Sequence, residues 1–373
     1  MIRFPQITGI GAALSATLTA STAALPVALT AIAAALALFS SISAAQSAPP
    51  AKSEQIIMND SGGATQVANR KTFYDAFAKK YGIKVNMTSP PDLGKLRAMV
   101  QSGNVEWTVT EIAGPDAVLA ERSGLLEPLD LSVIDMSHYP EKLRHRKYVF
   151  PKSAYSTIIG YRTDVFKDGK GPQSWADFWD VKKFPGPRTM QNSPIENLEF
   201  ALLADGVPAD KLYPLDVDRA FKKMDQIKPY VSVWWTTGAQ SAQLLIDKEA
   251  VIGTAWNGRY YDLVKKGAPI AMVWNQGAIK ESAFGIPKGA KDAYWGQRLL
   301  AIAADPKLQG EYANIIGYPG LNLEATKYTD PKIVPYLPTS PENLPKQFWV
   351  DLGYWADHSA AIQERWARWL LQK

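Results

Sequence analysis

The strongest constraint on the fold is a regular alternation of strand-like and helix-like segments in the first third of the chain. Short apolar runs predict buried strands, and runs with apolar residues three or four positions apart predict amphipathic helices. In chain order these runs occupy residues 55–58, 65–81, 83–87, 92–102, 104–110 and 116–124. Strands that alternate with helices in this way predict an open, mainly parallel sheet with helices on both faces.

The same alternation returns later in the chain. The expected strands and helices are at residues 155–161, 193–205, 217–227, 239–247, 251–255 and 270–274. A chain of 373 residues is too long for one ordinary domain and suits two. We therefore expect an α/β protein with two lobes, the first from 53–159 plus 281–327 and the second from 160–280 plus 328–373. Ligands of open α/β sheets bind beyond the carboxyl ends of the strands, so a cleft between the lobes is expected.

Residues 1–48 differ in kind from the rest of the chain. Arg3 is their only charged residue, and small residues at 43–47 form two possible cleavage patterns. This composition predicts a secretory signal peptide that is removed on export. The alternative is a retained membrane anchor, because the uncharged stretch is long enough to cross a bilayer. Export without any cysteine favours a bacterial periplasm as the location.

Composition argues against several kinds of chemistry. Without cysteine, the chain has no disulfide, no thiolate nucleophile and no Cys-ligated metal. Its three histidines, His138, His145 and His358, lie far apart, and no HExxH, GxSxG or P-loop motif is present. The net charge of +5 comes without a block of Lys and Arg, so nucleic acid is not an expected partner. We expect no cofactor, no metal and no enzymatic activity. An exported hydrolase with paired carboxylates is the alternative, since Asp and Glu are plentiful.

The stretch from 249 to 259 is the first candidate for a binding site. Its apolar start predicts a buried strand, and it ends in Trp256-Asn257-Gly258-Arg259. An aromatic ring can cover an alkyl chain or face a cation, and a guanidinium can hold a carboxylate through two hydrogen bonds. The alternative is a core tryptophan beside a surface arginine. Two further candidates are the turn that contains Ser61 and Gly63, before a helix N-terminus, and Trp235.

At these residues the chain resembles the periplasmic substrate-binding proteins of bacterial polyamine-type ABC importers, the spermidine/putrescine branch. The shared motifs, in order, are GIKV at 82–85, WADF at 175–178, WNG at 256–258, IPK at 286–288 and GYP at 317–319. The resemblance implies a two-lobed, type II periplasmic binding-protein fold that closes on its ligand without catalysis. It also implies a monomer that delivers a small molecule to an inner-membrane permease. A ligand sensor without a transport role would share the same fold.

Site residues are carried over from the resemblance one at a time. Trp256 matches the aromatic residue that flanks the alkyl chain of the ligand, and Tyr318 matches a tyrosine in the cleft. Glu196 falls where the polyamine binders place a carboxylate for an ammonium group. Before residue 286 those proteins carry an aromatic-x-Asp, whereas this chain has Lys280-Glu281-Ser282. Glu281 and Ser282 are therefore candidates, although the aspartate itself is missing.

Arg259 is a departure that bears on the ligand. Diamine binders have a small neutral residue at this position, and a cation there would repel a diamine. In relatives that bind γ-aminobutyrate-like ligands, an arginine at this position is suited to hold the ligand carboxylate. A buried charge without a partner costs several kcal/mol, so one Arg with one Glu favours an ω-amino acid such as γ-aminobutyrate. A polyamine is the alternative ligand, followed by anions, phosphonates and other amines.

Overall fold

The computed structural model describes residues 51–372 of the chain. The predicted signal peptide at 1–48 lies outside the described residues. Within residues 51–372, no helix is both long enough and apolar enough to span a membrane.

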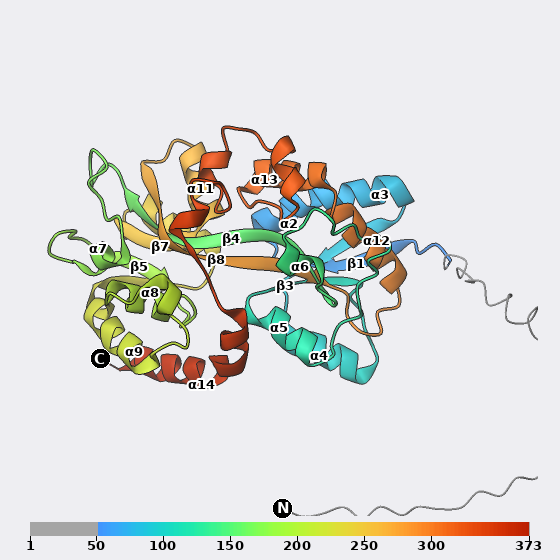
Figure 1. The fold of residues 1–373 in the computed structure, drawn as a ribbon, viewed down its shortest axis with the longest axis horizontal. Helices are drawn as coiled ribbons and strands as arrows, with labels where there is room; N and C mark the ends of the chain where they lie inside the picture. The colour runs from blue at the N-terminus through green and yellow to red at the C-terminus, as the bar shows by residue number, and fades with distance from the viewer. Residues whose placement is uncertain (1–50, 373) are drawn as a thin grey trace, which may run out of the picture. The chain divides into compact units, whose positions relative to one another are not determined.

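A nine-stranded mixed sheet runs through the described part of the chain (Figure 1). Its strand order is β2-β1-β3-β8-β4-β7-β5-β6, and β9 pairs with β8. Pairing is parallel within each end of the sheet and antiparallel at β3/β8, β8/β4 and β4/β7. The strands are β1 (Gln55–Asn59), β2 (Lys84–Thr88), β3 (Val109–Ala113), β4 (Val149–Arg162), β5 (Arg188–Gln191), β6 (Val231–Trp235), β7 (Ile252–Trp256), β8 (Ile270–Gly285) and β9 (Phe348–Trp349).

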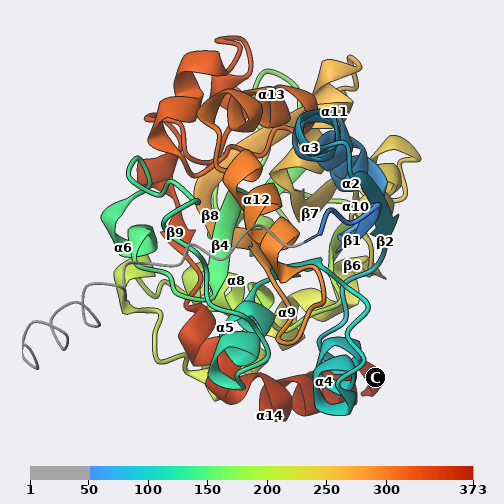
Figure 2. The ribbon, with the colours of Figure 1, turned by 90° about the vertical axis from the view of Figure 1, so that its right-hand side faces the viewer.

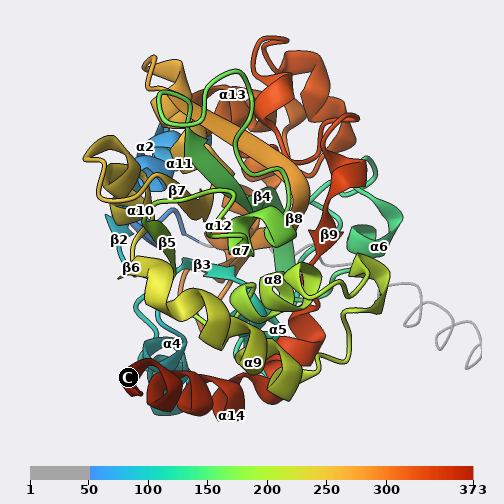
Figure 3. The same cartoon turned by 90° about the vertical axis from the view of Figure 1, so that its left-hand side faces the viewer.

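Helices cover both sides of this sheet, as the sequence predicts. In Figures 1 and 2, α3, α11 and α13 lie on one side, and α4, α5 and α14 lie on the other. Figure 3 shows α8 and α9 beside β5 and β6, at the end of the sheet away from β2. The helices are α2 (Gly63–Asn69), α3 (Asp75–Tyr81), α4 (Leu93–Ser102), α5 (Pro115–Arg122), α6 (Glu141–Arg144), α7 (Trp175–Trp179), α8 (Asn197–Ala204), α9 (Val217–Ile227), α10 (Gly238–Ile246), α11 (Asn257–Lys265), α12 (Ala293–Ala303), α13 (Pro306–Ile316) and α14 (Leu352–Leu371).

Two large apolar cores lie along the sheet. The first contains Phe73, Phe77 and Trp295, and the second contains Trp175, Phe200 and Trp355. Strands β4 and β8 contribute side chains to both cores, and they pair with each other along most of their length. We propose that the cores belong to two lobes, lobe 1 around β1–β3 and lobe 2 around β5–β7, with β4 and β8 as the connection between them.

Several element boundaries differ from the sequence prediction. The helix expected at 65–81 is a nearly continuous helical stretch from Gly63 to Tyr81, in which a short π-helical segment, Arg70–Tyr74, joins α2 to α3. The strand expected at 104–110 is displaced to β3, and the strand expected at 270–274 continues as β8 to Gly285. Ser193 was expected to begin a helix, but α8 begins at Asn197 after Glu196, whose φ of 72° breaks the helical path.

Candidate ligand-binding cleft

A cavity of about 550 Å³ lies beyond the carboxyl ends of strands from both halves of the sheet. Residues after β1 and on β3 line it from the half proposed as lobe 1, and residues after β6 and β7 line it from the half proposed as lobe 2. Strand β4, which runs through both halves, adds Lys152, Ser153 and Tyr155. Open α/β sheets place ligands beyond the carboxyl ends of their strands, so this cavity is the candidate site.

Three aromatic rings form one wall of the cleft. Tyr155 on β4 lies between Trp256 and Tyr318, with ring centroids 6.0 Å and 5.9 Å away. Behind them, Trp235 is fully buried and meets Trp256 edge-on at 5.6 Å. Such contacts hold the rings in place, and the wall therefore offers a fixed apolar surface for an alkyl chain or for the face of a cation.

Glycines bring the aromatic wall and α11 together. A Cβ atom on Gly258 would lie 2.6 Å from the carbonyl oxygen of Ile316 and 2.6 Å from the Tyr318 ring. Beside it, the Asn257 amide donates to the Gly317 carbonyl at 2.8 Å and accepts from the Ser156 N–H at 3.0 Å. The motif WNG thus allows the start of α11 to pack directly on the segment that carries Tyr318.

Arg259, on the first turn of α11, supplies a positive charge to the cleft. It lines the cavity, and its Nε is buried without a hydrogen-bond partner. Within residues 51–372, no carboxylate lies at ion-pair distance from its guanidinium. Gly238, the first residue of α10, lies against it, since a Cβ there would be 2.7 Å from Arg259 Nε. The start of α10 and Arg259 therefore place positive potential at one end of the cleft.

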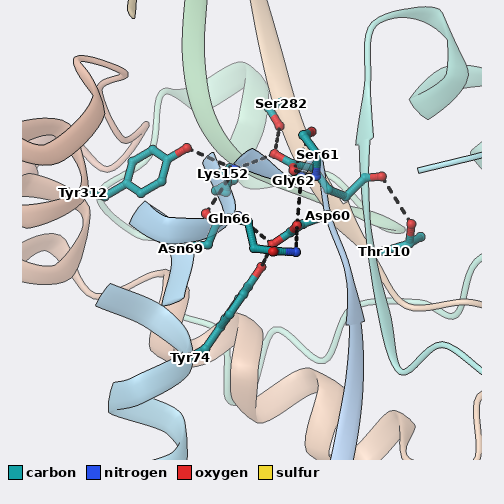
Figure 4. Close-up of polar contacts among 11 residues, drawn as sticks. Asp60, Ser61, Gly62, Gln66, Asn69, Tyr74, Thr110, Lys152, Ser282 and Tyr312 are labelled. Atoms are coloured by element: carbon teal, nitrogen blue, oxygen red, sulfur yellow. Dashed lines mark hydrogen bonds and ion pairs between the residues drawn. The ribbon is translucent and has the colours of Figure 1, made fainter. Parts of the chain in front are cut away.

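A buried carboxylate, Glu111 on β3, lies at the lobe 1 end of the cleft and is surrounded by donors. Its Oε2 accepts from the N–H of Ser61 at 2.9 Å and from the Ser61 hydroxyl at 2.7 Å. Its Oε1 accepts from the Lys152 ammonium at 2.5 Å and from the Ser282 hydroxyl at 2.6 Å. Figure 4 shows Lys152, Ser61 and Ser282 close to one another, with Tyr312 on the far side of the lysine. Both oxygens of Glu111 are thus fully occupied by the chain itself.

The charges of Glu111 and Lys152 stabilise each other. Burial alone would raise the pKa of Glu111, but the adjacent ammonium outweighs it and lowers that pKa. Burial likewise opposes the charge of Lys152, and Glu111 reverses the effect, so the pKa of Lys152 is raised. The pair is therefore ionised on both sides and neutral as a whole, which leaves Arg259 as the net charge among the residues that line the cleft.

Asp60 supports the turn that carries Ser61. One carboxylate oxygen accepts from the Gly62 N–H at 3.1 Å and from Gln66 at 2.8 Å, and the other accepts from the Tyr74 hydroxyl at 2.9 Å (Figure 4). Burial raises the pKa of Asp60. Gly62 has a φ of 67°, a conformation that favours glycine. These contacts fix the turn at the edge of the cleft.

The structure places most of the expected site residues around this cleft. The lining includes Ser61, Gly63, Trp256, Arg259, Ser282 and Tyr318. Trp235 does not line it, because Trp256 stands in front of its ring. Glu281 lies on β8 next to Ser282, and successive side chains on a strand point to opposite faces. Ser282 therefore reaches the cleft, and Glu281 instead pairs with Arg146.

Glu196 is buried, with 1% of its surface exposed, and it does not line the cavity. Its carboxylate pairs with the Lys280 ammonium at 2.6 Å and accepts from the Thr157 hydroxyl at 2.7 Å. Lys280 lies 5.1 Å from the centre of the Tyr155 ring, so this pair stands behind the aromatic wall. The carboxylate that was expected to face a ligand ammonium is therefore occupied by an ammonium of the chain.

Sequence reasoning missed Glu111 and Lys152 as residues of the cleft; it predicted α10 as a helix over 239–247 but did not assign the start of that helix to the site. The expected strand at 104–110 ended just before Glu111, and the one at 155–161 began after Lys152. The sequence signal that could have identified them is a charged residue inside a predicted buried strand. A buried charge requires a partner, so such a residue points to an ion pair or a ligand. Thr237 caps α10 by accepting from the Gln240 N–H, and such a capping residue marks where free backbone N–H groups face the cleft.

Comparison with known proteins places this geometry in a family. Residues 72–337 match the family of bacterial extracellular solute-binding proteins. The γ-aminobutyric acid-binding protein of Pseudomonas aeruginosa is 31% identical over 335 residues, 87% of this chain and 94% of the relative. The spermidine/putrescine-binding periplasmic protein of Escherichia coli is 25% identical over 272 residues, 69% of this chain and 76% of the relative.

A solved structure agrees with these relatives. The structure named Atu4243-GABA receptor has a TM-score of 0.80 and 39% identity, and the match covers 86% of this chain and 98% of that one. The predicted resemblance and fold class are thereby confirmed. The chain belongs to the bacterial extracellular solute-binding proteins, which bind small molecules for ABC transporters and are not enzymes.

Proposed function

We propose that the cleft binds a small ω-amino acid, with γ-aminobutyrate as the leading candidate, or a closely similar amino-acid derivative. One observation carries this proposal: the Arg259 guanidinium lines the cleft beside the start of α10, and no carboxylate of residues 51–372 pairs with it. A ligand carboxylate would complete this site through two charge-assisted hydrogen bonds. The relative and the solved structure that are named for γ-aminobutyrate support the same ligand class.

The remainder of the cleft supports a ligand with only one ammonium. The rings of Tyr155, Trp256 and Tyr318 suit a short methylene chain and can face a single cation. Among residues 51–372, Glu111 is the only carboxylate that lines the cavity, and Lys152 already neutralises it. A polyamine would bring at least two positive charges to Arg259 with no free carboxylate to receive them, so the structure favours the amino acid.

Calorimetry with γ-aminobutyrate, putrescine and spermidine tests the ligand class, using wild type, Arg259→Ala and Arg259→Lys. Loss of a charge-assisted hydrogen-bonded pair removes about 1.5–3 kcal/mol, so Arg259→Ala should weaken γ-aminobutyrate binding by about 10- to 100-fold. Arg259→Lys keeps the charge but not the two-pronged geometry and should fall between. Putrescine should bind no more weakly to Arg259→Ala than to wild type. Tighter binding of wild type to putrescine or spermidine than to γ-aminobutyrate would contradict the proposal.

The family, together with the sequence of residues 1–48, supports a proposal for the cellular setting. We infer that the chain is exported by its predicted signal peptide, acts in the periplasm as a monomer, and delivers its ligand to an inner-membrane ABC permease without binding nucleic acid. Closure of the two lobes on the ligand would be favoured by contacts that reach the ligand from both lobes. The second candidate is a ligand sensor without a transport role. A reconstituted uptake assay in which no permease recognises the closed protein would favour the sensor.

A further inference from the structure

Lys152 and Glu111 form an ion pair that no ligand is needed to complete. The ammonium lies 2.5 Å from the carboxylate, and the two side chains are 1% and 2% exposed. Both residues nevertheless line the cleft, so the buried pair lies directly beside the space that a ligand would occupy. The Lys152 ammonium also lies 3.3 Å from the Tyr312 hydroxyl and 3.4 Å from the Asn69 side-chain oxygen.

We propose that Lys152 is a specificity-determining residue that acts as a built-in ammonium group. It occupies the carboxylate which, left free, would receive an ammonium from the ligand, and it thereby excludes diamines from the cleft. This inference rests on the proposed function, because it explains why a ligand with a single ammonium is selected. Its own evidence is the geometry of Lys152 and Glu111, which does not depend on the identity of the ligand.

The charges explain how the exclusion works. With Lys152 present, the pair is neutral, and a diamine entering the cleft finds Arg259 as an uncompensated like charge. Without Lys152, Glu111 would be a buried carboxylate held only by Ser61 and Ser282, neither of which is charged. A buried carboxylate without a cation is strongly disfavoured, so a cationic ligand would gain the energy of restoring the pair.

A second pair in the same region repeats the arrangement. Lys280 lies 2.6 Å from Glu196, which is buried behind the aromatic wall next to Tyr155. Thus two carboxylates close to the cleft each have a lysine of the chain as their cation. Only Glu111 lines the cavity, however, and Lys152 is therefore the residue that we assign to selectivity.

The test is calorimetry of putrescine and γ-aminobutyrate binding to wild type, Lys152→Met and the double variant Lys152→Met/Glu111→Gln. Methionine keeps an unbranched apolar stem like that of lysine, one atom shorter, and removes the charge. We expect Lys152→Met to bind putrescine at least about tenfold more tightly than wild type does. The matched double variant has neither charge and should lose this gain. Equal putrescine affinity in wild type and Lys152→Met, or a gain that persists in the double variant, would overturn the inference.

The reverse variant keeps the test decisive if Lys152→Met does not fold. Glu111→Gln leaves the lysine without its carboxylate and keeps the size and planar shape of the side chain, although the amide nitrogen cannot accept the hydrogen bonds of the oxygen it replaces. Glutarate, a dicarboxylate of similar length to γ-aminobutyrate, should then bind at least about tenfold more tightly than to wild type, and the double variant should again lose the gain. No gain for glutarate would overturn the inference.

Failure of the proposed function gives a different pattern. If wild type ignores γ-aminobutyrate but Lys152→Met gains putrescine, the ligand assignment falls and the role of Lys152 stands. If wild type binds γ-aminobutyrate and neither single variant gains its expected ligand, the ligand assignment stands and the role of Lys152 falls.

Discussion

Gly238 is the position where the smallest change should have the largest effect on binding. In Gly238→Ala the new Cβ would lie 2.7 Å from Arg259 Nε and 2.9 Å from two atoms of the Trp256 ring, whereas ordinary contacts begin at 3.4 Å. The Trp256 ring is held between Trp235 and Tyr155, so it has little room to retreat. The guanidinium is the more flexible neighbour and should move away from the start of α10.

Two opposing terms set the stability of this variant. Adding a methyl group to a packed site costs about 1–3 kcal/mol, and replacing glycine by alanine within a helix returns about 1 kcal/mol. The net destabilisation should therefore be about 0–2 kcal/mol, which the protein can tolerate. Ligand affinity should change more: displacement of the guanidinium removes a charge-assisted pair of about 1.5–3 kcal/mol, or about 10- to 100-fold in Kd.

The assay is calorimetric titration with γ-aminobutyrate, accompanied by chemical denaturation of wild type and Gly238→Ala. Gly353→Ala in α14 is a matched control, since it also adds a methyl group to a helical glycine but lies outside the cleft lining. The control should bind as wild type does. Unchanged affinity for γ-aminobutyrate in a folded Gly238→Ala protein would refute the view that Arg259 and the start of α10 bind the ligand jointly.

Two buried carboxylates provide the remaining predictions. Burial raises the pKa of Glu199 from 4.5 to about 7, against hydrogen bonds at 2.6 Å from Tyr213 and Trp355. The folded state then binds more protons than the unfolded state between these values, so stability from this group is present below pH 4.5 and is lost as pH rises through 7. The loss is about 3 kcal/mol at most, and urea denaturation across this range should show a flatter profile in Glu199→Gln; identical slopes would contradict it. Lys280→Met should cost about 3–5 kcal/mol because it leaves Glu196 buried without a cation, and Lys280→Met/Glu196→Gln should recover most of the loss. Thermal or urea unfolding measures both, and a double variant no more stable than the single one would contradict the prediction.

The sequence predicts the layout of the sheet and helices well, because their signals are local. The amphipathic spacing that predicts a helix over 65–81 lies within the helical stretch that runs from Gly63 to Tyr81, and Asp92 caps α4 by accepting from the Lys95 N–H. Charged residues inside strands caused the largest errors. The strand expected at 104–110 ends one residue before Glu111, whereas β3 runs from Val109 to Ala113 and contains it.

The position of Trp256 and Arg259 could be predicted because both follow directly from the end of one strand. Pairings between distant segments could not. The preference of Glu196 for Lys280 depends on α8 meeting β8, which no local pattern specifies. Whether Glu281 or Ser282 faces the cleft depends on the register of β8 against β4, and that register shifts twice along the pair.

The pairing of β4 with β8 has a mechanical consequence. Because β4 and β8 are hydrogen-bonded along most of their length, we expect them to bend across the plane of the sheet more easily than they slide within it. Rotation of the proposed lobes should therefore bring Arg259 and Ser61 together along one fixed arc, with Tyr155 on the bending strand. The distance between Arg259 and Ser61 in the closed state would then set the length of the ligand. A solute too short to contact both residues, or too long to fit between them, would not stabilise the closed state.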